Sequence, residues 1–517
     1  FRRVLFRSFK MAKLMTAEEA VKAYIKDGMT IATNGFVGAV QPEGMMRAIQ
    51  DSFLKEGTPR DLTLLHAAGQ GGGKDAEGNN VGQVNHLGEE GLLKRVIAGH
   101  YGLAPRIQKL ALENKVAAYN MPQGCLSELF REIAAGRPGL LTHVGLNTFV
   151  DPDLEGGMLN DKAREMGSYV QKVNFNGEEK LFYPSFPIDV ALIHASYVDT
   201  MGNCSLEEEG TLADILPIAQ AAYTTGGKVI VTVEKSHYVE YGSLDTRFVQ
   251  VPGIYIEAIV LVDSDCAKQT NGSYHNEAFS GEKRIPMSAM EPMPMNARKI
   301  IARRCAMELK AGAVVNLGIG MPEGVANIVA EEGIEGMVLT TESGTIGGVP
   351  ASGGDFGVTT NPDTILHQSF QFDFYDGGGL DIAFLGLAQC DKFGNINVSK
   401  FGPRIAGCGG FINITQNTPV VVFCGTFTVK GKNKFLENVE QITFSADFAN
   451  KTGQKVLYVT ECCVFQLTKE GIELIEVAPG VDIEKDILAH MDFKPIIKDV
   501  KVMDERIFKD EIMGLAK

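Results

Sequence analysis

The chain has 517 residues, 44% of them hydrophobic and 22% charged, which is the composition of a globular protein with more than one domain. A formal net charge of −15 disfavours nucleic acid and anionic membrane surfaces, so we expect neither as a partner. The nine cysteines are scattered without C-x-x-C spacing, and we therefore expect no metal site, no disulfide framework and a reduced, cytoplasmic location.

Residues 1–10 do not begin with methionine, carry several basic side chains and precede a plausible start at Met11. We interpret them as a non-native extension, because they lack the apolar stretch and the cleavage site of a signal peptide. The first ordered element begins at Thr16, where Glu19 follows at capping-box spacing. We expect a helix from there that ends at Gly28.

The elements that follow this helix occur twice along the chain. A β-rich run at 29–34 leads into a glycine loop at 35–44, which contains Pro-Glu-Gly. Much later, a helical pattern at 297–310 is followed by a strand pattern at 313–317 and a second glycine loop at 318–324, which also ends in Pro-Glu-Gly. The repeated order indicates two copies of one plan.

A second internal match contains no gap. Strand-like and turn-like segments keep one offset of 192 residues, which pairs 188–193 with 380–385, 199–203 with 391–395, and 229–231 with 421–423. Short Val/Ile-rich strands alternate with helical patterns, which is typical of parallel sheets. We therefore predict an α/β protein of two duplicated open domains with mainly parallel sheets.

The boundary between the copies is marked by composition. Residues 269–296 contain Asn-Gly, Ser-Gly and several prolines, which is typical of a linker. We expect an N-terminal domain at 11–268, this linker, and a C-terminal domain at 297–517.

One carboxylate distinguishes the two copies. The strand pattern at 336–341 runs into Glu342 and a glycine-rich segment, whereas the equivalent strand at 61–66 is followed by glycines without an acid. The carboxyl end of a strand is where open α/β sheets place their chemistry, and backbone N–H groups of small residues can receive an oxyanion there. The alternative for Glu342 is a helix cap or a solvated side chain, but its presence in only one copy favours a catalytic role.

The joint order of several motifs resembles the family I coenzyme A transferases, and among them the single-chain propionate and acetate CoA-transferases. The resemblance runs from Met11 to the C-terminus, with an α-like domain before a β-like domain. It rests on Gly318-Ile-Gly320-Met-Pro322, Glu342-Ser-Gly, Gly347-Gly348, Gly394-Asn395 and Gly407-Cys-Gly409-Gly410.

This resemblance implies a transferase that exchanges CoA between short-chain acyl-CoA and carboxylates of the acetate and propionate class. Glu342 would carry CoA as a glutamyl thioester between two half-reactions, with CoA as a substrate and no bound cofactor or metal. A carboxylate suits this task because it can form a mixed anhydride, which CoA thiolate then opens at the glutamyl carbonyl. The family also implies a homo-oligomer.

Further site residues are implied by the same resemblance. Gln123, in Asn120-Met-Pro-Gln-Gly, would bring an amide to the oxyanion formed at the glutamyl carbonyl. Backbone or side-chain contacts to CoA would come from Gly318, Gly320, Asn395, Gly409, Gly410 and Gly431. Each has a structural alternative: a tight βα turn for Gly318 and Gly320, and a Gly-Asn turn for Asn395, since Asn203 occupies the same place in the first copy.

Two other functions remain open from the residues alone. The loop Gly318-x-Gly320-x-x-x-Gly324 follows a strand, and Glu342 lies near the place of a ribose-binding acid, so an NAD(P)-dependent oxidoreductase is one alternative. The loop is one residue longer than the dinucleotide motif and contains Pro322. A CoA-ester hydrolase, in which water opens the same thioester, is the other.

Overall fold

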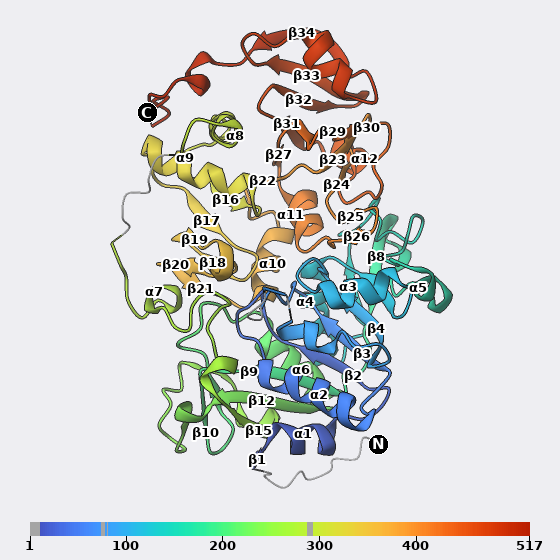
Figure 1. Cartoon of the computed structure of the whole chain (residues 1–517), viewed down its shortest axis with the longest axis vertical. Coiled ribbons are helices and arrows are strands. Elements are labelled where there is room, and N and C mark those ends of the chain that lie inside the picture. Colours follow the sequence, from blue (N-terminus) through green and yellow to red (C-terminus); the bar gives the residue numbers. More distant parts are fainter. Residues whose placement is uncertain (1–10, 74–77, 80, 287–292, 517) are drawn as a thin grey trace.

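The computed structural model describes residues 11–73, 78–79, 81–286 and 293–516. The segment 1–10 that we interpret as an extension lies outside the described residues, as does 287–292 within the expected linker. The N-terminal half forms the lower part of the molecule in Figure 1 and the C-terminal half the upper part. Within the described residues, no helix is long and apolar enough to cross a membrane.

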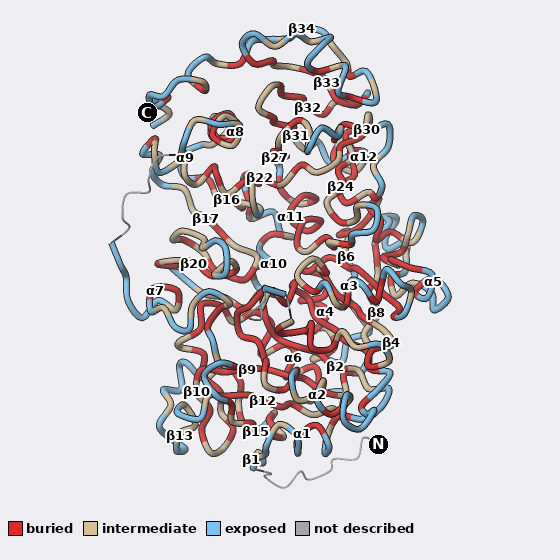
Figure 2. Tube along the Cα trace, in the orientation of Figure 1, coloured by how far each residue is buried: buried red, intermediate tan, exposed pale blue. Residues whose placement is uncertain are grey.

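The N-terminal half is built on an eight-stranded sheet in which every neighbouring pair is parallel. Its central strands are continuous apolar runs that are buried on both faces, as expected for a sheet covered by helices (Figure 2). In spatial order the strands are β1 (Lys13–Met15), β15 (Ile256–Val262), β12 (Lys228–Glu234), β9 (Val190–His194), β2 (Thr30–Thr33), β3 (Leu62–His66), β4 (Leu93–Ala98) and β5 (Ala117–Asn120).

The first helix confirms the predicted capping box but is shorter than predicted. Thr16 accepts a hydrogen bond from the Glu19 backbone, and α1 spans Ala17–Tyr24 rather than reaching Gly28. The chain turns extended at Ile25, whose side chain is buried, and Gly28 adopts a positive φ in the turn before β2. The other helices of this half are α2 (Glu43–Glu56), α3 (Pro105–Leu112), α4 (Gln123–Ala134), α5 (Asp161–Met166) and α6 (Ile215–Thr224).

The C-terminal half has a ten-stranded sheet with a parallel centre and antiparallel pairs on both sides of it. The prediction of mainly parallel sheets is confirmed. In spatial order the strands are β21 (Thr364–Ile365), β18 (Thr345–Ile346), β17 (Val338–Thr340), β16 (Val314–Leu317), β22 (Ile382–Gly386), β27 (Val420–Cys424), β31 (Lys455–Val459), β32 (Cys463–Thr468), β33 (Gly471–Val477) and β34 (Ile496–Val502).

Five principal helices accompany this second sheet. The predicted helix at 297–310 ends early, at Ala306, because the chain there turns through Met307 and the following residues into β16. The helices are α8 (Ala297–Ala306), α9 (Gly324–Glu332), α10 (Gln368–Asp376), α11 (Phe411–Asn417) and α12 (Ala446–Thr452).

The two sheets share their central order. The sequence β12-β9-β2-β3 in the first sheet corresponds to β27-β22-β16-β17 in the second, and β9 and β22 begin 192 residues apart, as do β12 and β27. The turns at 199–203 and 391–395 are also the same, since Asn203 donates to Asp199 at 2.8 Å and Asn395 donates to Asp391 at 3.0 Å. The structure thus confirms the duplication.

Smaller sheets flank the two large ones. A three-stranded antiparallel sheet combines β6 (Gly139–Thr142), β8 (Glu178–Pro184) and β7 (Gln171–Phe175). Matching small sheets occur in the two copies: β13 (Tyr238–Val239), β10 (Tyr197–Asp199), β11 (Cys204–Ser205) and β14 (Val249–Val251) in the first, and β24 (Ile396–Asn397), β23 (Gln389–Asp391) and β30 (Phe435–Leu436) in the second.

The described part of segment 269–296 is packed rather than extended. Gln269 and Thr270 are buried, and the segment includes the short helix α7 (Glu277–Ser280), whose Phe279 belongs to the N-terminal core. Thr270 bonds to Asp355 of the C-terminal half. The composition that suggested a linker therefore belongs to a segment that contacts both halves.

Candidate active site

Glu342 lies at the carboxyl end of β17, in the tight turn that leads to β18. Thr340 on β17 pairs with Asn316 on β16, and at the equivalent place Leu65 on β3 pairs with Ala32 on β2. Through the common register of the two sheets, Glu342 therefore corresponds to Ala67 of the first half, which is buried. The carboxylate that the sequence marks as unique to one copy is also unique in space.

The direct partner of Glu342 comes from a distant loop. The N–H of Gly410 donates to Glu342 Oε2 at 3.1 Å. A Cβ atom at Gly410 would lie only 2.5 Å from that oxygen, so only glycine allows this approach. Gly410 ends the loop 407–410, which precedes α11.

This loop is held by the N-terminal half. Gly409 donates to the Gly99 carbonyl at 2.7 Å and accepts from the Gln123 backbone at 2.9 Å. The N–H of Cys408 donates to the side chain of Asn120 at 2.9 Å. The partner of Glu342 is therefore positioned by the strand ends of the other half, and the site lies at the seam between the copies.

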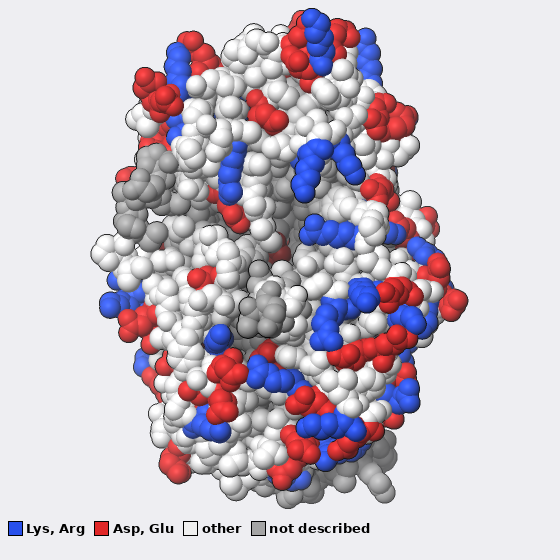
Figure 3. All heavy atoms as spheres, viewed as in Figure 1, with Lys and Arg blue, Asp and Glu red and all other residues white. Residues whose placement is uncertain are grey.

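Glu342 faces a cavity of about 510 Å³. One wall is apolar and includes the aromatic side chains of Phe36 and Phe356, whose centroids are 6.2 Å apart. Polar groups of the wall include Asn316, whose Oδ1 is buried without a hydrogen-bond partner among the described residues. Between the halves, the face seen in Figure 3 is hollowed, and Lys and Arg side chains gather on the right of this hollow.

Burial sets the acidity of Glu342. Removal of the carboxyl group from water raises its pKa to about 7, and the hydrogen bond from Gly410 opposes this shift. Among the described residues, no Lys or Arg forms an ion pair with it, and so its charge is balanced by a backbone dipole rather than by a cation. Such a carboxylate is a better nucleophile than one held in a salt bridge.

The glycines after Glu342 have a different role from the one predicted. The N–H of Gly344 donates to Thr341 at 3.2 Å and that of Gly347 donates to Leu339 at 2.8 Å, so these donors shape the turn. A Cβ at Gly344 would also lie 2.1 Å from the Leu366 carbonyl. The N–H groups of Gly344 and Gly347 are therefore taken up by the turn in this structure.

Gly318 and Gly320 follow β16 as predicted, but their backbone groups are differently placed. Gly318 lines the cavity, yet its N–H donates to the Phe384 carbonyl at 2.8 Å and continues the sheet. This N–H is therefore not a donor for a phosphate in this structure. The Gly320 carbonyl accepts from Arg298 at 2.7 Å, and Arg298 itself lines the cavity.

The remaining predicted residues are not all brought together. Gln123 is the first residue of α4, is buried, and lies beside the 407–410 loop, with Oε1 3.7 Å from the place of a Cβ at Gly409. Asn395 instead holds its turn, donating to Asp391 and accepting from Ala446 at 2.9 Å. Gly431 is exposed in the turn between β28 (Thr428–Val429) and β29 (Lys432–Asn433). Neither Asn395 nor Gly431 lines the Glu342 cavity.

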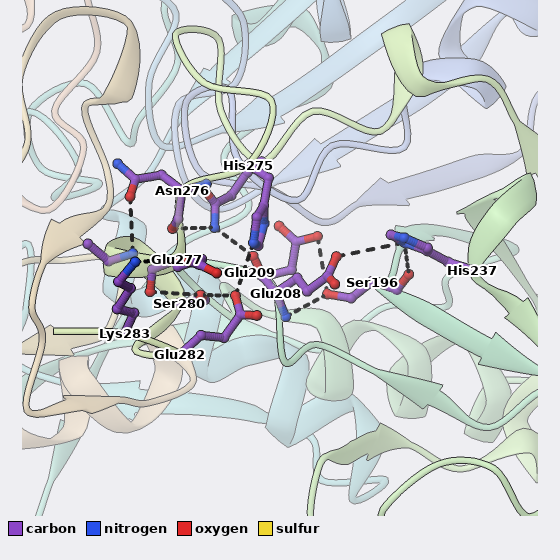
Figure 4. Close-up of polar contacts among 12 residues, drawn as sticks. Ser196, Glu208, Glu209, His237, His275, Asn276, Glu277, Ser280, Glu282 and Lys283 are labelled. Atoms are coloured by element: carbon purple, nitrogen blue, oxygen red, sulfur yellow. Dashed lines mark hydrogen bonds and ion pairs between the residues drawn. The ribbon is translucent and has the colours of Figure 1, made fainter. Parts of the chain in front are cut away.

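A second polar cluster lies in the N-terminal half, around a cavity of about 200 Å³. Glu208 and Glu209 contribute to it from the loop after β11, His237 from the turn after β12, and His275 from the 269–296 segment (Figure 4). Many of these groups contact one another, as in the ion pair between His275 and Glu282 at 3.2 Å. Within the described residues, no three His, Cys, Asp or Glu side chains are arranged to hold a metal ion.

Sequence reasoning missed two residues near Gln123. Gln368 on α10 and Asp214 before α6 are buried, and Gln368 bonds both to Gln123 and to Asp214. They are far apart along the chain and belong to no motif, so no pattern in the sequence relates them to Glu342.

The fold and the seam site are those of an enzyme that handles CoA esters, and comparison with known proteins supports this class. The coenzyme A transferase family matches residues 14–261. The chain is 44% identical to the caffeate CoA-transferase of Acetobacterium woodii, over 98% of this chain and 99% of that one. It is 39% identical to the acetate CoA-transferase YdiF of Escherichia coli K12, over 97% of this chain and 96% of that one.

A solved structure agrees along the whole chain. The acyl-CoA transferase YdiF of Escherichia coli O157:H7 superimposes with a TM-score of 0.89 at 36% identity, covering 98% of both chains. A second structure of that protein is a thioester complex with CoA. The present chain belongs to the coenzyme A transferase family, as its sequence predicts. Its activity is the transfer of CoA between an acyl-CoA and a carboxylate, and these relatives give no support to an oxidoreductase or a hydrolase.

Proposed function

We propose that Glu342 is the nucleophile of this transfer and carries CoA as a glutamyl thioester. The observation that supports this most directly is the contact with Gly410, which places a half-buried carboxylate, without an ion pair to Lys or Arg of the described residues, against a backbone N–H at 3.1 Å. The N–H is held by the other half of the molecule and is available before the reaction begins. Such fixed donors stabilise developing oxyanions without reorganisation.

The reaction follows from the carboxylate. An oxygen of Glu342 attacks the thioester carbonyl of acyl-CoA, the C–S bond breaks, and CoA leaves as a thiolate while a mixed anhydride forms. The thiolate then attacks the glutamyl carbonyl of the anhydride, which releases the first acid as a carboxylate and leaves CoA on Glu342. An incoming carboxylate reverses these steps, so the kinetics are ping-pong and atoms balance without a further reactant.

Shelter from water is needed because hydrolysis of either intermediate would waste the activated ester. The seam provides it, since Glu342 lies between strand ends of one half and the loop held by the other. The Lys and Arg side chains beside the hollow in Figure 3 suit the phosphates of CoA, which an otherwise acidic molecule must bind locally.

The acids are proposed from the relatives and from the cavity. Acetate is the first candidate, because one relative is named an acetate CoA-transferase, and propionate is considered with it because it is larger by one methylene only. Larger aryl-substituted acids are a second candidate, because Phe36 and Phe356 provide an aromatic wall and one relative is named for caffeate. Comparing kcat/KM for acetate, propionate and caffeate with one acyl-CoA donor decides between them.

The mechanism is tested by the mass of the intact protein after addition of acyl-CoA without an acceptor acid. We expect an adduct of the mass of CoA on Glu342 that borohydride reduces, and no adduct in Glu342→Gln. An adduct on another residue, or acylation without CoA, would contradict the mechanism.

A further inference from the structure

A chain of buried amides and a carboxylate ends beside the site. Gln123 Nε2 donates to Gln368 Oε1 at 3.0 Å, and Gln368 Nε2 donates to Asp214 Oδ2 at 2.6 Å. The three residues are 2%, 0% and 3% exposed, so water does not compete for these bonds. They come from α4, α10 and the start of α6, and the chain crosses the seam between the two halves.

The far end of this chain is fixed. The N–H of Asp214 donates to Asn34 at 2.8 Å, and Ser127, one turn after Gln123 on α4, bonds to the other oxygen of the Asp214 carboxylate. Burial raises the pKa of Asp214 to about 7, while the bonds from Ser127 and Gln368 oppose the shift and favour the ionised form. An ionised carboxylate only accepts hydrogen bonds.

The direction of each bond follows from that acceptor. Because Asp214 accepts a hydrogen bond from the amide nitrogen of Gln368, the amide oxygen of Gln368 is the atom that can accept a bond from Gln123. Gln123 must then offer its own nitrogen, and one of the two N–H groups of that nitrogen remains for another acceptor. Gln123 lies next to Gly409, which precedes the Gly410 donor of Glu342.

We propose that Gln368 and Asp214 are positioning residues for the transfer: they hold the Gln123 amide in one orientation beside the 407–410 loop, whose Gly410 contacts Glu342, so that its free N–H meets the oxyanion at the glutamyl carbonyl. This inference rests on the proposed function of Glu342 and adds two residues that do not touch the substrate. It makes the reaction depend on the contact between the halves, because Gln368 and Asp214 lie on opposite sides of the seam.

The test is a double-mutant cycle on the rate of CoA-adduct formation, measured by intact mass after rapid mixing with acyl-CoA. Gln123→Met is expected to slow the adduct by about 100-fold, the usual effect of removing one oxyanion donor. Gln368→Met is expected to slow it by about 10-fold or more, with KM for acyl-CoA little changed. In the Gln123→Met background, Gln368→Met should add almost no further loss, because its effect passes through Gln123.

A matched control is Gln416→Met. Gln416 is another buried glutamine of the C-terminal half that bonds to the N-terminal half, through the Leu146 carbonyl at 2.9 Å and the Gly145 N–H at 2.8 Å. It should lower the melting temperature as much as Gln368→Met does, without slowing the adduct. Equal slowing in this control would mean that a loosened seam, not amide orientation, causes the effect.

The outcomes separate the two proposals. If no adduct forms on Glu342 in the wild type, the proposed function fails. If the adduct forms but Gln368→Met leaves its rate unchanged, or slows it equally with and without Gln123, the positioning role fails while the glutamyl thioester stands.

Discussion

The two halves of this enzyme share one arrangement of strands but divide its work unequally. At the end of the equivalent strands, the C-terminal half has Glu342 where the N-terminal half has the buried Ala67. The N-terminal half instead supplies the strand ends that hold the partner of Glu342. Two copies of one scaffold therefore differ at a few positions, and under the proposed function one copy carries the reactive carboxylate while the other holds its partner.

The starts of the equivalent helices α6 and α11 show one such difference between the copies. Under the 192-residue offset, the first residue of α6, Ile215, corresponds to Gly407, yet α11 begins only at Phe411. In the second copy the first helical turn is thus replaced by the glycine loop 407–410. Residues of this loop bond instead to Gly99, Gln123 and Asn120 across the seam, and the N–H of Gly410, just before α11, is the donor to Glu342.

The largest expected effect comes from replacing Glu342, the residue in which the two copies differ. Glu342→Gln should lower kcat by at least about 10⁴-fold, the size of loss seen when a nucleophile is removed from a covalent mechanism. CoA exchange between acyl-CoA and acetate measures this. Asp381→Asn is the control, because Asp381 and its counterpart Asp189 bond alike to backbone N–H groups at 2.8 Å, and this variant should retain kcat. Full exchange in Glu342→Gln would refute the division of labour.

The glycine loop gives the next largest effect. Gly410→Ala should lower kcat by about 100-fold, because a Cβ 2.5 Å from Glu342 Oε2 displaces the carboxylate and its N–H donor together. Steady-state kinetics and the yield of CoA adduct measure this. Gly453→Ala is a control for a solvent-side glycine with nothing within 4 Å, which should cost stability through its positive φ but not kcat. Equal losses of kcat in both would contradict the role of Gly410.

The acidity of Glu342 predicts a pH profile. The nucleophile is the ionised form, and the pKa of about 7 means that a growing fraction is protonated as pH falls below neutrality. We expect kcat/KM for acyl-CoA to fall about tenfold per pH unit below 7, and to level off above it. A profile that remains flat down to pH 5 would mean that Glu342 is ionised like an exposed acid and that the seam does not shelter it.

The smallest expected effect comes from the equivalent turns at 199–203 and 391–395. Asn203→Ala and Asn395→Ala each remove two side-chain bonds, including one at 2.9 Å to a distant backbone N–H, and each should cost about 1–3 kcal/mol of stability. If Asn395 only holds its turn, both variants keep their KM for CoA esters. A KM that rises only in Asn395→Ala, measured at equal fractions folded, would assign Asn395 a binding role that its copy lacks.

Local patterns in the sequence predicted the elements and their duplication. Alternation of apolar runs and glycine turns gave the strands of both copies, and the capping box at Thr16 formed as predicted. The ends of helices were less well predicted, as at Gly28 and Lys310, because burial of neighbours such as Ile25 decides where a helix stops. The described part of segment 269–296 has linker composition and yet contacts both halves, since proline and glycine also occur in segments held by tertiary contacts.

The sequence alone established the repeated α/β plan and pointed to Glu342, because the strand end that carries this acid has no acid at the equivalent place in the first copy. Only the tertiary structure decided what surrounds that acid: the N–H of Gly410, the shelter of the seam and the amide chain from Asp214. These groups are far apart along the chain, and hydrogen bonds of about 3 Å between them exist only once both halves have folded and met.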